Sequence, residues 1–399
     1  MTLCIHTYSP ICIPLNWQSE LLENSSERLQ LLEAVFAEDD NIQVSFPDWP
    51  MGYGSLEHDN LPLLYQPSAT LQIRNLEQLD EINHAELYLY DNCLGVLWIS
   101  LDSDYTYETI DDLAISEKIT GLASTHLQPI LETLYQIPES RHLIEPRHYR
   151  FFEDEKSALC SASPLWVARM LTQSTHRQKE DYLPWLHHID AESSSLLLGS
   201  GNSLLLKETA FNDVHRIMVL SQYHSALMSR IEQILKKSLR AFNSVHYSRA
   251  ANKKLRANMQ LHQQRNDHIE FITIQFSAAI AGVQGQRRNL LDQFNKAWQV
   301  PAQESRVQKL TALLQLRLNR HLGERIKQQN RGIQTLLASL GALSLIGLMT
   351  DLHQLARDTQ HDDTMGLLDL LSIVAIEDIL NVTILMVVLL TYIFYRYHE

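Results

Sequence analysis

Residues Gly332 to Thr350 read GIQTLLASLGALSLIGLMT and contain no charged side chain. A second uncharged stretch, ILNVTILMVVLLTYIFY, runs from Ile379 to Tyr395. A helix of about 20 apolar residues spans the roughly 30 Å hydrocarbon layer of a bilayer, and shorter stretches span it with little tilt. The two stretches therefore predict two membrane crossings, which form a C-terminal two-helix transmembrane hairpin. A buried hairpin in a soluble domain is the alternative interpretation.

The charges beside these stretches predict their orientation. Arg and Lys residues precede the first stretch and Arg396 follows the second, whereas the connecting segment 351–378 holds one Arg against six Asp and one Glu. By the positive-inside rule both termini face the cytoplasm, as in a multi-pass protein of the bacterial inner membrane. Acidic residues at an outer mouth would concentrate cations, and a loop kept soluble by its charge is the alternative. The candidates are Asp351, Asp358, Asp362 and Asp363.

The first crossing has a face of small or polar residues. At 100° per residue these positions fall near one direction, and the large leucines point elsewhere. Such a face suits a pore lining, with Ile346 as an apolar constriction, and it equally suits tight packing between membrane helices. The candidate pore-lining residues are Thr335, Ser339, Ala342, Ile346, Met349 and Thr350.

The formal net charge of −14 is unevenly divided. Residues 1–160 carry 27 acidic and 7 basic side chains, whereas residues 214–331 carry 6 acidic and 20 basic ones. This division predicts attraction within or between subunits, or an anionic ligand on the basic segment. The candidate ligand-binding residues are Arg230, Lys236, Lys237 and Arg240.

Residues 1–212 alternate short strand-like and helical patterns, which predicts an α/β sensor-like domain. No basic n-region opens the chain, so no secretory signal is expected and this domain is assigned to the cytoplasm. The four cysteines lack CxxC spacing, which favours neither a zinc site nor a disulfide frame. No catalytic arrangement stands out, so we expect no enzyme, no required cofactor and no direct nucleic-acid binding.

Residues 213–331 predict a helical stem, because apolar residues recur there at spacings of three and four. Pro301 places a turn at Gln299 to Gln303, since residues before proline disfavour helix. A final helix from near Glu304 then runs into the first crossing. The expected parts are thus an α/β head at 1–212, a stem at 213–331, crossings at 332–350 and 379–395, and an outer loop at 351–378.

This order of parts resembles the CorA-like family of magnesium channels. The family signature is Gly-Met-Asn at the outer end of the first crossing, where this chain has Gly347-Leu348-Met349-Thr350 and no asparagine. The resemblance implies a homo-oligomer, a pentamer, whose stem helices continue into pore-lining first crossings. It also implies Mg²⁺ as a transported ion.

The function expected from the resemblance is an oligomeric ion channel or transporter gated through its cytoplasmic domain. One alternative is a membrane effector of a bacterial antiviral, CRISPR-type defence system, in which a nucleotide second messenger binds the cytoplasmic part and the inner membrane is permeabilised. A second alternative is a membrane-anchored scaffold that conducts nothing.

Overall fold

A computed structural model describes residues 3–14, 25–45, 67, 69–90, 92–103, 110–136, 160–172, 179–244, 249–281, 283–358 and 375–397. It divides into two compact units, Met1–Leu316 and Arg317–Glu399. The strands are β1 Leu3–Cys12, β2 Ile42–Ser45, β3 Ala69–Ile73, β4 Ile82–Leu89, β5 Leu94–Ser103, β6 Ala168–Thr172, β7 Ala191–Glu192, β8 Leu196–Leu198 and β9 Asn202–Leu205. The α-helices are α1 Ser25–Phe36, α2 Arg74–Glu77, α3 Asp112–Tyr135, α6 Leu183–Leu186, α7 Phe211–Ser244, α8 Arg249–Ala281, α9 Gly285–Ala297, α10 Val300–Asp358 and α12 Ile376–Tyr397.

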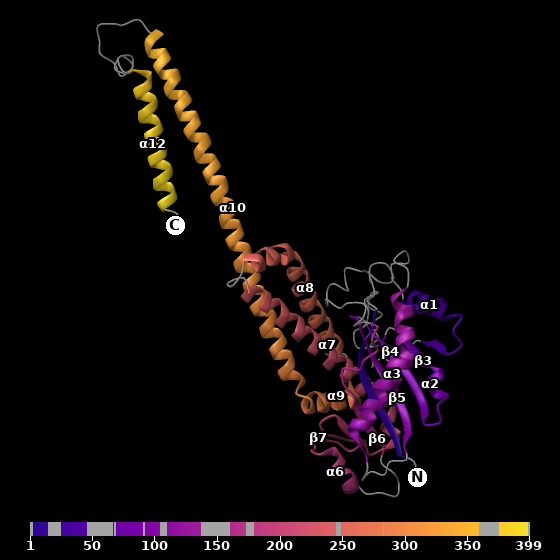
Figure 1. The fold of residues 1–399 in the computed structure, drawn as a ribbon. Coiled ribbons are helices and arrows are strands. Elements are labelled where there is room, and N and C mark those ends of the chain that lie inside the picture. The colour runs from indigo at the N-terminus through magenta and orange to yellow at the C-terminus, as the bar shows by residue number, and fades with distance from the viewer. Residues whose placement is uncertain are drawn as a thin grey trace. The chain divides into compact units, whose positions relative to one another are not determined.

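The described strands form one mixed sheet in the order β2-β3-β4-β5-β1-β6-β9-β8-β7 (Figure 1). Neighbouring strands are antiparallel except β6 and β9, which are parallel. The longest pairing joins β1 to β5 from Leu3↔Ser103 to Cys12↔Leu94. At the hairpin between β4 and β5, Asn92 and Cys93 have positive φ angles of 64° and 57°. Such angles bring an antiparallel chain back on itself in a tight turn.

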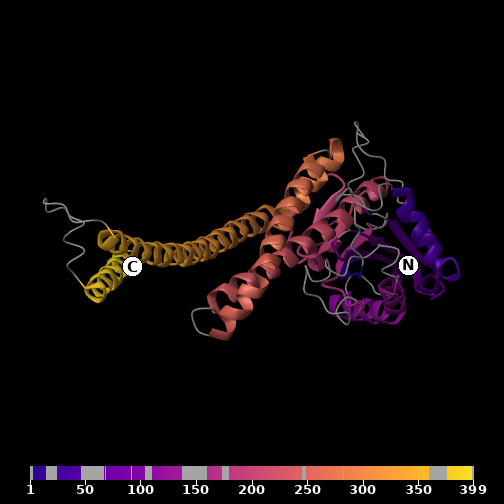
Figure 2. The same ribbon diagram turned by 90° about the horizontal axis from the view of Figure 1, so that it is seen from above.

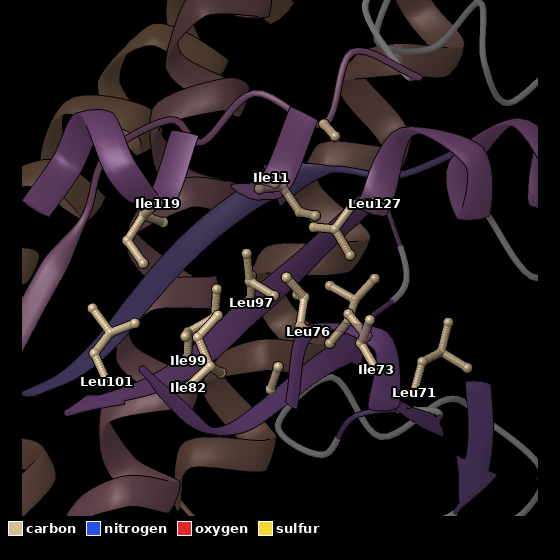
Figure 3. Close-up of a cluster of buried hydrophobic side chains, with 14 of the residues drawn as sticks. Ile11, Leu71, Ile73, Leu76, Ile82, Leu97, Ile99, Leu101, Ile119 and Leu127 are labelled. Atoms are coloured by element: carbon tan, nitrogen blue, oxygen red, sulfur yellow. The ribbon is translucent and has the colours of Figure 1, made fainter. Parts of the chain in front are cut away.

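One face of the sheet carries the aliphatic core of the first unit. Leu97, Ile99 and Leu101 alternate along β5 toward this face, because successive strand side chains point to opposite sides. They pack with Ile119 and Leu127 of α3, and Figure 3 shows these side chains gathered between the helix and the strands. Burial of aliphatic residues at this face stabilises the α/β part by the hydrophobic effect.

The opposite face of the sheet packs against α7. Trp98 lies between Leu97 and Ile99 in sequence and so points to the other side, where its ring centroid is 4.3 Å from that of His215. Phe211 at the start of α7 stacks with His215 at 5.6 Å. This second interface is therefore aromatic and polar, unlike the aliphatic face covered by α3.

A buried polar network ties α3 to the strands β6 and β9. Arg169 of β6 donates hydrogen bonds to the main-chain oxygen of Asp112, to the hydroxyl of Ser116 and to Asn202 Oδ1, the last at 3.2 Å. The Asp112 carboxylate accepts from Asn202 Nδ2 at 2.8 Å and from Trp185 Nε1 at 3.0 Å. Asp111, the residue before α3, caps the helix by accepting from the main-chain N–H groups of Leu113 and Ala114.

The first unit continues with long helices. Figures 1 and 2 show α7 and α8 side by side, and α9 also packs on α7, where Arg287 donates to Asp213 at 2.7 Å. The chain turns at Gln299, whose φ is 52°, and enters α10 at Val300. The expected turn at Gln299 to Gln303 is therefore shorter, because Pro301 occupies the first helical turn, where its missing N–H costs nothing.

The expected fold class is confirmed in its coarse form: an N-terminal α/β part built on a mixed sheet is followed by long helices. The alternation of strands and helices expected over residues 1–212 is present, for example in β3 at Ala69–Ile73 and in the β8–β9 pair. Among the described residues, one helix, α10, is long and apolar enough to cross a membrane. The two-helix hairpin and the five-part domain division stay predictions.

Candidate functional site

The apolar segment of α10 leaves its large side chains exposed. None of the 18 residues in its most apolar window is buried. Isolated exposed leucines are normal on a soluble surface, but a continuous apolar band indicates a lipid or protein partner. The exposed aliphatic residues of this segment are Ile333, Leu336, Leu337, Leu340, Leu343, Leu345 and Leu348.

The six predicted pore-lining residues differ in exposure. Thr335 and Ser339 are exposed, whereas Ala342, Ile346, Met349 and Thr350 are half-buried in the second unit. The four half-buried residues are thus less exposed to solvent than the leucines of the same helix. Because this burial arises within one chain, it reflects packing in that chain and leaves the pore lining a prediction.

The hydroxyl groups of this face have partners within the helix. Thr335 donates to the main-chain oxygen of Arg331 and Ser339 to that of Leu336, both at 2.8 Å. Thr350 donates to the main-chain oxygens of Ile346 at 2.7 Å and Gly347 at 2.8 Å. A polar group without a partner is costly in hydrocarbon, and these bonds remove that cost.

The predicted outer-mouth acids fall in two places. Asp351 and Asp358 are exposed in the last turns of α10. Asp362 and Asp363 lie outside the described residues.

The second uncharged stretch lies within α12. Most of its described aliphatic side chains, among them Val382, Leu385 and Val388, are exposed. Thr383 is buried, while Asn381 is exposed. The helix therefore presents apolar side chains on most of its described surface, as α10 does.

The predicted ligand-binding cations of α7 differ in their surroundings. Arg230 donates to Cys12 Sγ on β1 at 2.6 Å, so it faces the sheet. Lys236 is 2.6 Å from Glu232, and the hydrogen bond from Lys236, with burial opposing it, lowers the pKa of Glu232. Lys237 and Arg240 are exposed. An anionic ligand on this helix would have to compete with Glu232 for Lys236.

A buried histidine site, which the sequence did not indicate, joins α7 to the sheet. The Tyr88 hydroxyl is 2.5 Å from Glu86 Oε2 and 2.8 Å from His215 Nε2, and the Tyr8 hydroxyl is 2.9 Å from His215 Nδ1. Burial lowers the pKa of His215 to about 3, so the ring is neutral at physiological pH. We call His215, Tyr8, Tyr88 and Glu86 the His215 cluster.

Proton counting fixes the direction of these hydrogen bonds. Tyr88 has one hydroxyl proton and donates it to the acceptor-only carboxylate of Glu86. Its oxygen therefore accepts from the Nε2–H of His215, and Nδ1 of the neutral ring accepts from Tyr8. Burial alone would raise the pKa of Glu86, but hydrogen bonds from His84 and Tyr88 outweigh it and the pKa is lowered. The arrangement holds the ring proton of His215 on Nε2, between the imidazole and the oxygen of Tyr88.

A second buried histidine lies where α7 meets the start of α10. His224 Nε2 is 3.4 Å from Glu304 Oε1, and its ring stacks on Phe276 of α8 with centroids 4.0 Å apart. Burial lowers the pKa of His224 to about 3 and raises that of Glu304. Since His224 is neutral, this contact is a polar contact rather than an ion pair.

In the described part of the chain, no group of three or more His, Cys, Asp or Glu residues is arranged to hold a metal ion. Comparisons of the whole chain with protein-family models, with curated proteins and with solved structures find no match. The class that the fold itself defines is an α/β domain followed by long helices, one of which is apolar enough to enter a membrane.

Proposed function

We propose that this chain is a subunit of a gated membrane channel, in which α10 and α12 cross the bilayer and several copies surround a pore lined by α10. The observation that carries the proposal is the continuity of α10. Val307 and Leu314 near its beginning are buried in the first unit, and the same uninterrupted helix continues into the exposed apolar segment.

The exposed aliphatic residues supply the driving force for membrane insertion. Each large aliphatic side chain that leaves water contributes about 1.5–3 kcal/mol. The band of such residues on α10, joined by those of α12, favours lipid around both helices. Two crossings also place the short segment between them and the two termini on opposite sides of the membrane, in agreement with the charge distribution.

The beginning of α10 supports a route for control by the N-terminal unit. Besides the contact of Glu304 with His224, Gln303 donates to Ser229 of α7 at 2.9 Å, and Arg306 is 3.7 Å from Glu232. Because α10 is one continuous helix, we expect a displacement of α7 against its beginning to be passed along the helix toward the apolar segment. This is the hinge-and-shear type of switching known from packed helices.

The test is ion flux through liposomes that contain the purified full-length chain. Vesicles loaded with potassium, sodium or magnesium chloride are compared with protein-free vesicles, before and after addition of a panel of nucleotides. Flux in at least one condition supports a channel, and dependence on one nucleotide identifies the gating signal. If the correctly inserted protein, wild type and the Ile346→Ser variant alike, gives no flux under any condition, the channel is excluded and a scaffold remains.

The two-crossing topology has its own test. A single cysteine placed at Thr364, in the segment between the two uncharged stretches, reacts with an impermeant maleimide from outside intact cells if that segment is external. The native cysteines of the first unit, Cys4, Cys12, Cys93 and Cys160, are the internal control and react only after lysis and denaturation, because burial raises the pKa of the Cys4 thiol. Labelling of both only after lysis contradicts the topology.

A further inference from the structure

Four of the five basic residues just before the apolar segment share one face of α10. At 100° per residue, positions 317, 320, 327 and 331 fall within about 80° of the helix circumference. Glu324 lies on the same face, 3.6 Å from His321. We call Arg317, Arg320, Lys327 and Arg331 the basic stripe. All four belong to the second unit.

The basic stripe continues into the predicted pore face. Taken together, the stripe and the six predicted pore-lining positions occupy a sector of about 140°. Leu336, Leu340 and Leu343, which are exposed, lie outside this sector. If the leucines face lipid, the basic stripe and the small residues face the same interior space, one after the other along the helix.

The acids at the other end of α10 do not share this face. Positions 351 and 358 fall about 160° or more from Arg331 around the helix, on the side of Leu340. Arg357 falls inside the sector. From position 317 to 358 the sector therefore holds five Arg or Lys residues and one carboxylate, that of Glu324.

The positive-inside rule does not account for this placement. The rule concerns how many Lys and Arg residues flank a crossing and is indifferent to which face of the helix they occupy. Arg325 satisfies the rule equally well, yet its position falls about 120° from Arg331. A stripe on one face requires a reason specific to that face.

We propose that the pore selects anions, and this inference rests on the proposed channel function. Each subunit would contribute the basic stripe once, so the pore entrance would be surrounded by rings of positive charge. Rings of Arg or Lys side chains select anions, and a narrow entrance within a Debye length of about 8 Å is only partly screened by physiological salt. The permeant class is small inorganic anions such as chloride or phosphate.

The test is the reversal potential of full-length protein in planar bilayers under a potassium chloride gradient. Ile346→Ser serves as the background if the wild type stays closed. We expect a reversal potential with the sign of the chloride equilibrium potential. The double variant Lys327→Gln, Arg331→Gln should shift it toward zero, and the matched control Arg325→Gln, which removes one charge off the stripe, should leave it unchanged.

The other outcomes separate the two proposals. A reversal potential with the sign of potassium overturns anion selection but leaves the channel standing. A reversal potential that is insensitive to the double variant shows that the stripe does not set the selectivity, which also overturns anion selection by the stripe. No current in any variant overturns the channel itself.

Discussion

Nδ1 of His215 on α7 lies 2.9 Å from the hydroxyl of Tyr8 on β1, and Trp98 and Phe211 cover the ring. This buried side chain links α7 to the central strands of the sheet. In the neutral ring Nδ1 accepts from Tyr8, whereas protonation would turn Nδ1 into a donor, reverse this hydrogen bond and place a charge in a buried site. The attachment of α7 is therefore sensitive to acid.

Acid should destabilise the first unit through His215. Its folded-state pKa is about 3 against an ordinary 6.5, so between these values the unfolded chain binds a proton that the folded chain does not. Stability thus falls as pH falls below about 6.5, by up to about 1.4 kcal/mol per pH unit. His6 and His224, with pKa values of about 4 and about 3, act in the same direction. Denaturant unfolding of the full chain in detergent between pH 7.5 and 5 measures the effect.

The variant His215→Phe isolates the contribution of this residue. At pH 7.5 it should be less stable by about 1–3 kcal/mol, because the hydroxyl of Tyr8 is left buried without an acceptor. Its loss of stability on acidification should be smaller than that of the wild type, since one titrating group is gone. Equal slopes for the two proteins would show that His215 is not held neutral.

Arg169 should be a principal stabilising residue of the α3–sheet contact. The variant Arg169→Met keeps most of the apolar stem but leaves Asn202 Oδ1 without its donor and the Asp112 carboxylate without its nearby cation. Loss of one partner in a buried charged network costs about 3 kcal/mol. The free energy of unfolding measures the loss. Arg74→Met is the control, because Arg74 is exposed and its guanidinium donates to the side-chain oxygen of Gln43, which is also exposed. The free energy of unfolding of this variant should differ from that of the wild type by at most about 0.5 kcal/mol.

Gly199 should tolerate no side chain. A Cβ there would lie 2.6 Å from the main-chain oxygen of Leu186 and 2.7 Å from that of His188, so the backbone must shift. Gly199→Ala should cost about 1–3 kcal/mol. Gly121, inside α3, has open space around its Cβ position, and Gly121→Ala should stabilise by about 0.5–1 kcal/mol. Thermal unfolding of the two variants should shift in opposite directions, and a Gly199→Ala variant as stable as the wild type would contradict the close backbone approach at the β8–β9 turn.

The sequence was sufficient for the elements with strong local signals. The alternating strands and helices of residues 1–212 and the helical periodicity that begins at residue 213 were read from local patterns, and the structure has both. The start of α10 was misplaced by four residues, because Pro301 breaks a helix in its interior but is favoured in its first turn. Pro301 does mark the boundary of a helix, but a proline alone does not show whether it precedes the helix or lies in its first turn.

The His215 cluster could not be predicted, because its members are far apart in sequence. Tyr8, Tyr88 and His215 meet only through the β4-β5-β1 strand order, which arises from long-range pairing. A partial signal did exist, since Tyr88 and Trp98 alternate with aliphatic residues along their strands and so mark a second, polar face. The contact of Arg230 with Cys12 could not be predicted for a related reason, since it arises from the packing of α7 on the sheet.

Ile346 should control the leak through the proposed pore. It lies on the small-residue face, is half-buried, and is the largest aliphatic residue among the six pore-lining candidates. An apolar ring closes a pore by excluding water, so Ile346→Ser should hydrate the constriction and raise the resting flux from liposomes. Leu340→Ser is the matched control: Leu340 is exposed and lies about 120° from Ile346 around α10, outside the predicted pore face, where the same polar group faces lipid and should leave the flux unchanged. If Leu340→Ser leaks and Ile346→Ser does not, the pore is lined by the leucine face, and if neither leaks in a well-inserted protein, Ile346 forms no gate.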